Sequence, residues 1–232
     1  MMAATRTATF GAPGDTSEEG IGTAIRFAHV TVVCDGRRLL DDLTFEVPLG
    51  VTAALLGPPG AGKTTAIETG SGVRRIDGGA IRLLGLEPAV AVASGRVGAV
   101  LASGGLPDGA RVGELLGFIR VLHDAPLSMD DLVERSGLES LMDRPTDRLS
   151  RSEAQQLRFA LALAGDPDLL FLDDPDQDLD LQARGGLWAN LERLKEEGRT
   201  VLLATRDADL AASIADRAIV LEQGRLRGEG EP

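Results

Sequence analysis

The sequence predicts an α/β fold built on a mainly parallel sheet with helices on both of its faces. Short apolar segments alternate with segments of helical periodicity along most of the chain, an order typical of parallel sheets. The length of 232 residues suits one domain of ordinary size, and 43% of the residues are apolar, which is enough for a sizeable core.

The first half of the chain carries most of the expected strands. Residues 51–56 form a continuous apolar run, the kind found in strands that are buried on both faces. We expect a helix directly after it, over residues 63–70, and then a turn at the Asp-Gly-Gly sequence of residues 77–79. The strands expected in this half are 24–33, 43–47, 51–56, 80–84 and 97–101.

Residues 105–148 interrupt the alternation and are expected to form an inserted α-helical subdomain. Apolar residues recur at helical spacing from Val112 to Leu122, and the helical pattern continues through 132–137 and 138–144. A long helix over 150–165 follows. Ser150 and Glu153 have the spacing of a capping box, which marks the start of a helix.

The last third of the chain returns to strands and helices in turn. The expected strands are 169–172, 200–204 and 218–221, and the expected helices are 181–197 and 207–215. Residues 1–22 are polar and lack the apolar segment of a signal peptide, so we expect a disordered leader there. Residues 229–232 are expected to be a flexible tail, which leaves 23–228 as the folded domain.

Composition excludes several classes of protein. The formal net charge is −12, which argues against nucleic acid as a partner, since a nucleic-acid-binding surface needs many basic side chains. Cys34 is the only cysteine, so an internal disulfide is impossible, as expected in a reducing compartment. No apolar run approaches the 18 or so residues of a membrane span. Only two residues, Lys63 and Lys195, are lysines.

One of those two lysines lies in a phosphate-binding motif, G-x-x-x-x-G-K-[ST], between a buried strand and a helix. Its glycines let successive backbone N–H groups point at phosphate oxygens, and the helix N-terminus adds partial positive charge. Lys63 supplies a full charge for the β- and γ-phosphates, and the Thr64 hydroxyl is a hard oxygen ligand for Mg²⁺. The nine residues of this phosphate loop are Gly57, Pro58, Pro59, Gly60, Ala61, Gly62, Lys63, Thr64 and Thr65.

A second motif supports a nucleotide site. The apolar strand at residues 169–172 ends in two carboxylates, Asp173 and Asp174, about 110 residues after the phosphate loop. A carboxylate at such a strand end holds Mg²⁺ in phosphate-loop enzymes. Asp173 is therefore the predicted Mg²⁺ residue with Thr64, and Asp174 stands where a base for the attacking water belongs.

Residues 24–228 resemble the ATP-binding subunit of an ABC transporter, and within that family they are most similar to the subunits of bacterial drug or antibiotic exporters. The resemblance rests on the two motifs above, on the sequence Leu-Ser-Arg-Ser-Glu at 149–153 and on the pair Leu179-Asp180. The resemblance implies a P-loop NTPase fold with an N-terminal antiparallel β part. It also implies a head-to-tail homodimer or heterodimer. In such a dimer Ser150, Arg151, Ser152 and Glu153 face the partner's ATP. A separately encoded permease and a cytoplasmic location at the inner face of the membrane are implied as well.

The chain departs from the family pattern at several functional positions. Cys34 stands where an aromatic residue stacks on adenine, and Ala102 stands where a glutamine contacts Mg²⁺ and water. Residues 149–153 stand where the family has its signature sequence, here called the signature segment. In it, Arg151 and Ser152 replace two glycines, and Glu153 brings a negative charge near the phosphates of the partner's ATP.

Two further departures lie beside the expected reaction centre. Asp174 replaces the usual glutamate, and its carboxylate is retracted by about 1.5 Å, a misplacement on a scale that can cost about 100-fold in rate. Arg206 replaces the switch histidine and cannot shuttle a proton, although its charge suits a γ-phosphate.

Three functions fit these observations to different degrees. The first is an energy-coupling subunit of an exporter that binds MgATP and hydrolyses it weakly. The second is a regulatory ABC-like module that dimerises on binding ATP with little or no hydrolysis. A small-molecule kinase fits the phosphate loop alone and gives no reason for the signature sequence.

Overall fold

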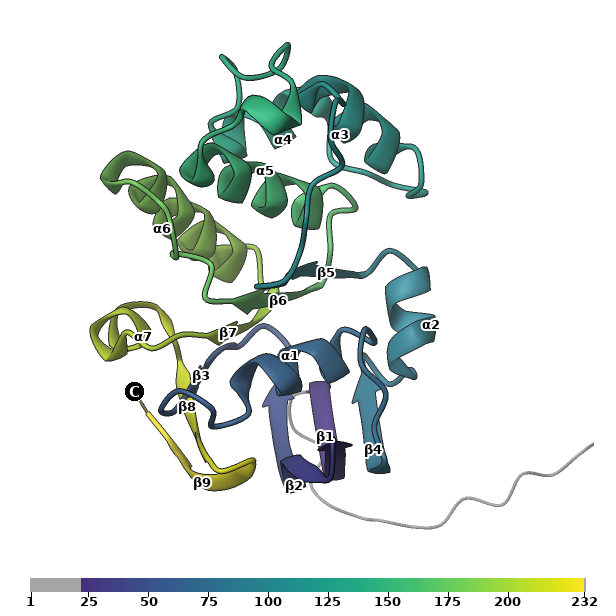
Figure 1. The fold of residues 1–232 in the computed structure, drawn as a ribbon, viewed down its shortest axis with the longest axis vertical. Helices are drawn as coiled ribbons and strands as arrows, with labels where there is room; N and C mark the ends of the chain where they lie inside the picture. Colours follow the sequence, from purple (N-terminus) through teal and green to yellow (C-terminus); the bar gives the residue numbers. More distant parts are fainter. Residues whose placement is uncertain (1–21, 232) are drawn as a thin grey trace, which may run out of the picture.

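The computed structural model describes residues 22–231, which form two sheets with helices between and around them (Figure 1). The strands are β1 Thr23–Cys34, β2 Arg37–Pro48, β3 Thr52–Leu56, β4 Gly78–Leu83, β5 Val97–Val100, β6 Leu169–Asp173, β7 Thr200–Ala204, β8 Arg217–Glu222 and β9 Arg225–Gly230. The helices are α1 Lys63–Gly70, α2 Pro88–Ala93, α3 Val112–Arg120, α4 Met129–Ser136, α5 Arg151–Leu163, α6 Leu181–Glu196 and α7 Ala208–Ile214, with a 3-10 turn at Thr146–Arg148.

The larger sheet confirms the predicted parallel architecture. Its order in the described residues is β5-β6-β7-β3-β8-β9, and every neighbouring pair is parallel except β8 with β9. Strands β3, β6 and β7 are almost wholly buried, as their apolar sequences predict. Because parallel strands end at the same edge, the residues that follow β3, β6 and β7 come together there.

The smaller sheet is antiparallel, in the order β2-β1-β4. Strand β2 begins earlier than the expected 43–47, directly after a two-residue turn at Asp35 and Gly36. Both turn residues have positive φ (48° and 75°), as a type I′ hairpin requires. The Asp-Gly pair is thus the sequence signal that sets the start of β2.

Helix α1 lies between the two sheets, where Figure 1 places it above β1 and β2. Its buried residue Ile67 shares one apolar core with Phe27 of the smaller sheet and Phe171 of β6. A side chain at Gly70 would meet the Phe171 ring at 2.9 Å, so this close approach requires glycine. The packing fixes the first turn of α1 beside the ends of β3 and β6.

Helices α3, α4 and α5 gather at one end of the molecule, above β5 and β6 in Figure 1. The expected helix over 138–144 is wrong, since these residues form turns. Gly137 adopts the left-handed conformation (φ 62°) that ends α4, and Pro145 disfavours helical backbone at the residue before it. Within residues 22–231, no helix combines the length and the apolar character that crossing a bilayer requires.

The end of the chain differs from expectation. Glu229 and Gly230 were assigned to a flexible tail, but they belong to β9 and pair with Ile219 and Ala218 of β8. The turn between β8 and β9 contains Gln223 and Gly224, both with positive φ, so a second short hairpin adds β9 as the edge strand of the sheet. Helix α2 was also missed; it begins with Pro88 at its first turn. The expected leader lies outside the described residues except for its last member.

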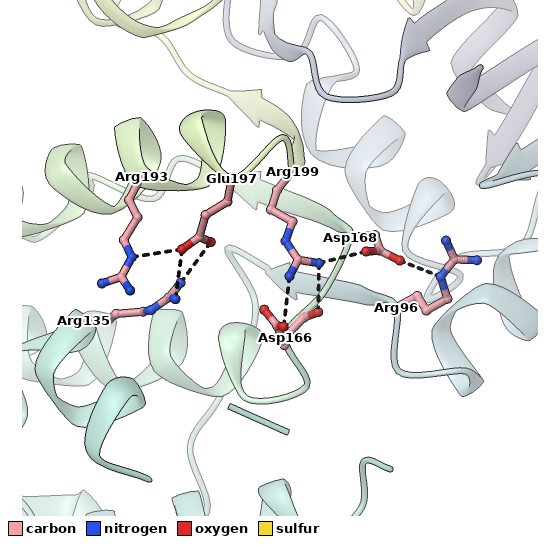
Figure 2. Close-up of polar contacts among 7 residues, drawn as sticks. All are labelled: Arg96, Arg135, Asp166, Asp168, Arg193, Glu197 and Arg199. Carbon is pink, nitrogen blue, oxygen red and sulfur yellow. Dashed lines mark hydrogen bonds and ion pairs between the residues drawn. The ribbon is translucent and has the colours of Figure 1, made fainter. Parts of the chain in front are cut away.

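Ion pairs join the turns at the edge of the sheet where β5, β6 and β7 begin (Figure 2). Arg199 pairs with Asp168 at 2.8 Å and with Asp166 at 2.9 Å. Arg96 pairs with the other oxygen of Asp168 at 2.6 Å. This chain of charges connects β5, the α5–β6 turn and the α6–β7 turn on the side of the sheet remote from the phosphate loop.

A second group of ion pairs fastens α4 to α6. Glu197 accepts hydrogen bonds from Arg135 of α4 at 3.0 and 3.3 Å, and it also pairs with Arg193 at 3.0 Å (Figure 2). The Arg135 side chain is only 8% exposed, whereas that of Arg193 is half exposed. The Asn190 side-chain amide also donates to the Arg135 carbonyl oxygen.

Candidate nucleotide-binding site

The phosphate loop connects β3 to α1, and three of its glycines have positive φ: Gly57 (150°), Gly60 (78°) and Gly62 (107°). A side chain at Gly57 would lie 2.3 Å from the Leu221 carbonyl oxygen, and one at Gly62 would lie 2.9 Å from the Leu40 side chain. Glycine is therefore required at both positions by sterics and by backbone conformation. The loop folds tightly enough for its N–H groups to line a cradle.

Lys63 begins α1, and its side chain turns back over the loop. Its ammonium group donates to the carbonyl oxygen of Gly57 at 2.6 Å and to that of Pro58 at 3.3 Å. Lys63 is only 7% exposed, and this burial lowers its pKa, although the negative charges of Asp174 and Asp173 act to raise it. The charge is thus held at the loop by weak carbonyl partners, which phosphate oxygens can replace.

Thr64, in the first turn of α1, lies beside Asp173, the last residue of β6. The Thr64 hydroxyl donates to Asp173 Oδ1 at 3.3 Å, while Asp173 Oδ2 is buried without a hydrogen-bond partner. Asp173 is 2% exposed, and burial raises its pKa, with Asp174 and Glu68 adding negative charge nearby. An unpaired buried carboxylate oxygen beside a hydroxyl fits a divalent cation with a preference for oxygen ligands, so this pair suits Mg²⁺.

Asp174 and Arg206 complete the wall opposite the loop. Asp174 follows β6 with φ 44°, and its amide donates to the Ala204 carbonyl oxygen at 2.9 Å. Its carboxylate pairs with Arg206 Nε at 3.4 Å, so Arg206 lies beside the cavity. The cavity between them measures about 200 Å³, and its lining residues are Leu39, Pro59, Gly60, Ala61, Gly62, Lys63, Thr64, Thr65, Asp174 and Arg206.

Leu39 is the cavity residue that sequence reasoning missed. It lies on β2, and its carbonyl oxygen is close to Gly62, so the β1–β2 hairpin forms one wall of the site. Cys34, the expected adenine position, is exposed at the end of β1 and does not line the cavity. Ala102 follows β5, and its backbone N–H is close enough to oppose the rise in the pKa of Asp173, so it does lie beside the expected Mg²⁺ residue.

The signature segment lies at the start of α5 and does not line this cavity. Both halves of the predicted capping box are present. Glu153 Oε2 accepts from the Ser150 amide at 2.8 Å, and Ser150 Oγ accepts from the Glu153 amide at 3.2 Å. Glu153 also pairs with Arg144 at 2.6 Å. The backbone hydrogen bond from Ser150 and the Arg144 charge keep the pKa of Glu153 below its ordinary value.

Known proteins match both the sequence and the fold. Residues 40–177, more than half of the chain, match the sequence model of the family described as ABC transporter. The chain belongs to the ABC transporter family. In this family the chain is an ATP-binding subunit, as the relatives described next show. The resemblance stated from the sequence is therefore confirmed, and so is the predicted P-loop NTPase fold.

Two relatives of this ABC subunit carry the name Nod factor export ATP-binding protein I. The protein of Burkholderia pseudomallei (strain 1710b) is 38% identical over 216 residues, covering 90% of this chain and 71% of the relative. The protein of Sinorhizobium fredii (strain NBRC 101917 / NGR234) is 36% identical over 217 residues, covering 90% and 63%.

Solved structures share the fold of the subunit. An ATP-binding subunit of an ABC transporter superposes with a TM-score of 0.82 at 24% identity, covering 90% of both chains. A dimeric ATP-binding cassette in a post-hydrolysis state, bound to ADP and Pi, gives a TM-score of 0.79 at 19% identity, covering 89% of this chain and 98% of that one.

Proposed function

We propose that this ABC subunit binds MgATP and hydrolyses it weakly, as the energy-coupling subunit of an exporter. The observation that carries the proposal is that Lys63, Thr64 and Asp174 line one cavity at the carboxyl edge of the sheet, with Asp173 in contact with Thr64. Two relatives are named as export ATP-binding proteins, which favours export as the direction of transport.

Each residue of the site has a role in this proposal. The amides of the phosphate loop and the Lys63 ammonium bind the β- and γ-phosphates. Thr64 and Asp173 would hold Mg²⁺, which when bound supplies positive charge beside the phosphate oxygens. Asp174 orients the attacking water and accepts its proton, and Arg206, paired with Asp174, adds positive charge beside the γ-phosphate.

Weak turnover follows from the same geometry. The short side chain of Asp174 and its pairing with Arg206 both reduce its reach toward a water molecule. Ala102 lies beside Asp173 but offers a methyl group where an amide would orient water. Interactions that hold phosphates are retained, whereas those that act on the water are weakened, and only the latter raise the rate of the chemical step.

A second ATP-binding subunit and a membrane partner complete the proposal. Ser150, Arg151, Ser152 and Glu153 would face the ATP of the partner subunit in a homodimer or heterodimer. One solved cassette with this fold is described as dimeric, and another is described as part of the CbiONQ transporter complex. We place the subunit at the inner face of the cell membrane, bound to a separately encoded permease.

Exposed apolar residues on α3 and just after it suit that permease contact. Phe118 is 60% exposed and Leu122 is 63% exposed, with Val121 beside them at 77%. Leu127, a few residues further along, packs instead against the core of the helical segment. The docking surface is therefore formed by Phe118, Val121 and Leu122.

Phosphate release by the purified subunit tests the proposal, with Lys63→Ala as the control. We expect slow release of phosphate from MgATP that the Lys63→Ala substitution abolishes. Equal release by the two proteins would assign the activity to contamination. MgATP binding without release above the control would instead support the regulatory ABC-like module, which the Asp174–Arg206 pair and Ala102 favour.

A further inference from the structure

Ser152 of the signature segment forms hydrogen bonds within its own chain to Asp180, the residue just before α6. Its hydroxyl donates to Asp180 Oδ2 at 3.0 Å and accepts from the Asp180 amide at 3.2 Å. Ser152 is 9% exposed, whereas Asp180 is exposed, so only the serine side of this reciprocal pair is buried. A glycine, which the family pattern has at this position, could make neither contact.

Asp180 in turn begins helix α6. Its second carboxylate oxygen accepts from the Ala183 amide at 2.9 Å, which makes Asp180 the N-cap of α6. These hydrogen bonds lower the pKa of Asp180, so the carboxylate stays charged and remains a good acceptor. The start of α5 and the start of α6 are thereby joined through one carboxylate.

Two more residues of α5 contact the segment between β6 and α6. The side-chain amide of Gln155, which is buried, donates to the Pro175 carbonyl oxygen at 3.2 Å. Arg151 lies 3.8 Å from Asp178, an exposed pair that adds little energy. Ser152 and Gln155 are three positions apart, so they lie on one face of the helix.

The segment that they hold, residues 174–180, needs external support. Asp174 (φ 44°) and Asp178 (φ 66°) both adopt the left-handed conformation, which residues other than glycine adopt rarely, although aspartate and asparagine do so more often than most. Within the segment, the Gln177 amide donates to Asp174 and the Leu179 amide to Asp176. Its first residue is also held by β7, through the bond from the Asp174 amide to Ala204, and α5 contacts the segment at Pro175 and Asp180.

We infer that Ser152 is a positioning residue within its own chain, holding segment 174–180 and so the Asp174 carboxylate in place. The inference rests on the proposed function in one respect, that Asp174 is the group facing the attacking water. It assigns the Ser152 hydroxyl to Asp180 and leaves Arg151 and the first amides of α5 for the partner's nucleotide. The start of α5 faces the ATP of the partner subunit, and Asp174 faces the ATP of its own chain. Because Ser152 links the two, a movement at one ATP site is passed to the other.

Hydrogen exchange of the nucleotide-free protein tests this directly, with Ser152→Ala as the variant, Ser152→Thr as the conservative replacement and Ser140→Ala as the control. Ser140 is exposed on the loop after α4. We expect Ser152→Ala to speed exchange of the amides in 176–183 about fivefold, the effect of losing one hydrogen bond. Ser152→Thr and Ser140→Ala should leave it near the parent value. Unchanged exchange in Ser152→Ala would overturn the inference.

Kinetics separate positioning from nucleotide contact. If Ser152 positions Asp174, Ser152→Ala lowers kcat for phosphate release and leaves KM unchanged, and Ser152→Thr restores kcat. A raised KM with unchanged kcat would assign the hydroxyl to nucleotide binding and overturn the inference. A parent protein that releases no more phosphate than Lys63→Ala would contradict the proposed hydrolysis, whereas the exchange result would still decide the role of Ser152.

Discussion

Asp174 is the residue on which the rate of the proposed reaction depends most. Its carboxylate reaches less far than a glutamate would, and Arg206 holds it at 3.4 Å. The sequence predicted Asp174 at the site because it follows a buried strand, and the resemblance to the family implied Arg206 there. It did not predict their ion pair, since side-chain pairing depends on the conformation of the residues after β6 and β7.

Asp174→Glu should raise kcat for phosphate release by up to about 100-fold, because the added methylene group restores the reach of the carboxylate toward water. KM should change little, since the phosphate loop is untouched. Steady-state phosphate release measures both constants, with Asp176→Glu as a control two residues away. An unchanged or lower kcat would show that the length of this side chain does not limit the rate.

Cys34 tests where the base of the nucleotide lies. The family pattern puts this position against adenine, whereas the structure leaves Cys34 exposed and outside the phosphate cavity. If adenine covers it, MgATP should slow labelling of Cys34 by a maleimide several-fold, and Lys63→Ala should remove the protection. Labelling that is equally fast with and without MgATP would separate Cys34 from the nucleotide.

Among the elements, α5 begins within one residue of its predicted start. Ser150 and Glu153 alone were sufficient, because a capping box is a local arrangement of side chain and backbone. The contacts of Ser152 with Asp180 could not be predicted, since they join residues 28 positions apart through the packing of α5 on α6. Leu39 was missed for a similar reason, as its place in the cavity depends on the register of β2 against the phosphate loop.

Glu153→Ala should lower the free energy of unfolding by about 1 kcal/mol at pH 7, the effect of losing one cap. The pKa of Glu153 lies below its ordinary value of 4.5 in the folded protein. Its contribution is therefore complete above that value and is lost as the pH falls through the folded pKa. Urea unfolding at a series of pH values measures the difference, with Glu139→Ala as the control. A difference that persists in acid would contradict the role of the charge.

Arg135→Ala should lower the free energy of unfolding by about 2 kcal/mol, because it removes a buried partner of Glu197 that joins α4 to α6. Arg193→Ala provides a matched control, since Arg193 pairs with the same carboxylate from a half-exposed position and should cost at most about 0.5 kcal/mol. Chemical denaturation measures both. Equal losses would mean that burial of the pair does not determine its strength.

At the scale of the whole molecule, the parallel sheet and its helices could be predicted because buried strands have continuous apolar sequences and alternate with helical segments. The strand order β5-β6-β7-β3-β8-β9 could not, since it depends on crossovers that no local pattern specifies. The resemblance to a family supplied the antiparallel N-terminal part, which local periodicity alone did not. Residues 138–144 were assigned wrongly because apolar spacing outweighed Gly137 and Pro145.

Equilibrium binding of MgATP, compared between the parent protein and Lys63→Ala, tests the central claim most directly. The cradle of residues 57–65 predicts one saturable site in each chain, and removal of the Lys63 ammonium should abolish measurable binding. Binding of equal strength in the two proteins, or the absence of binding in the parent, would contradict the account.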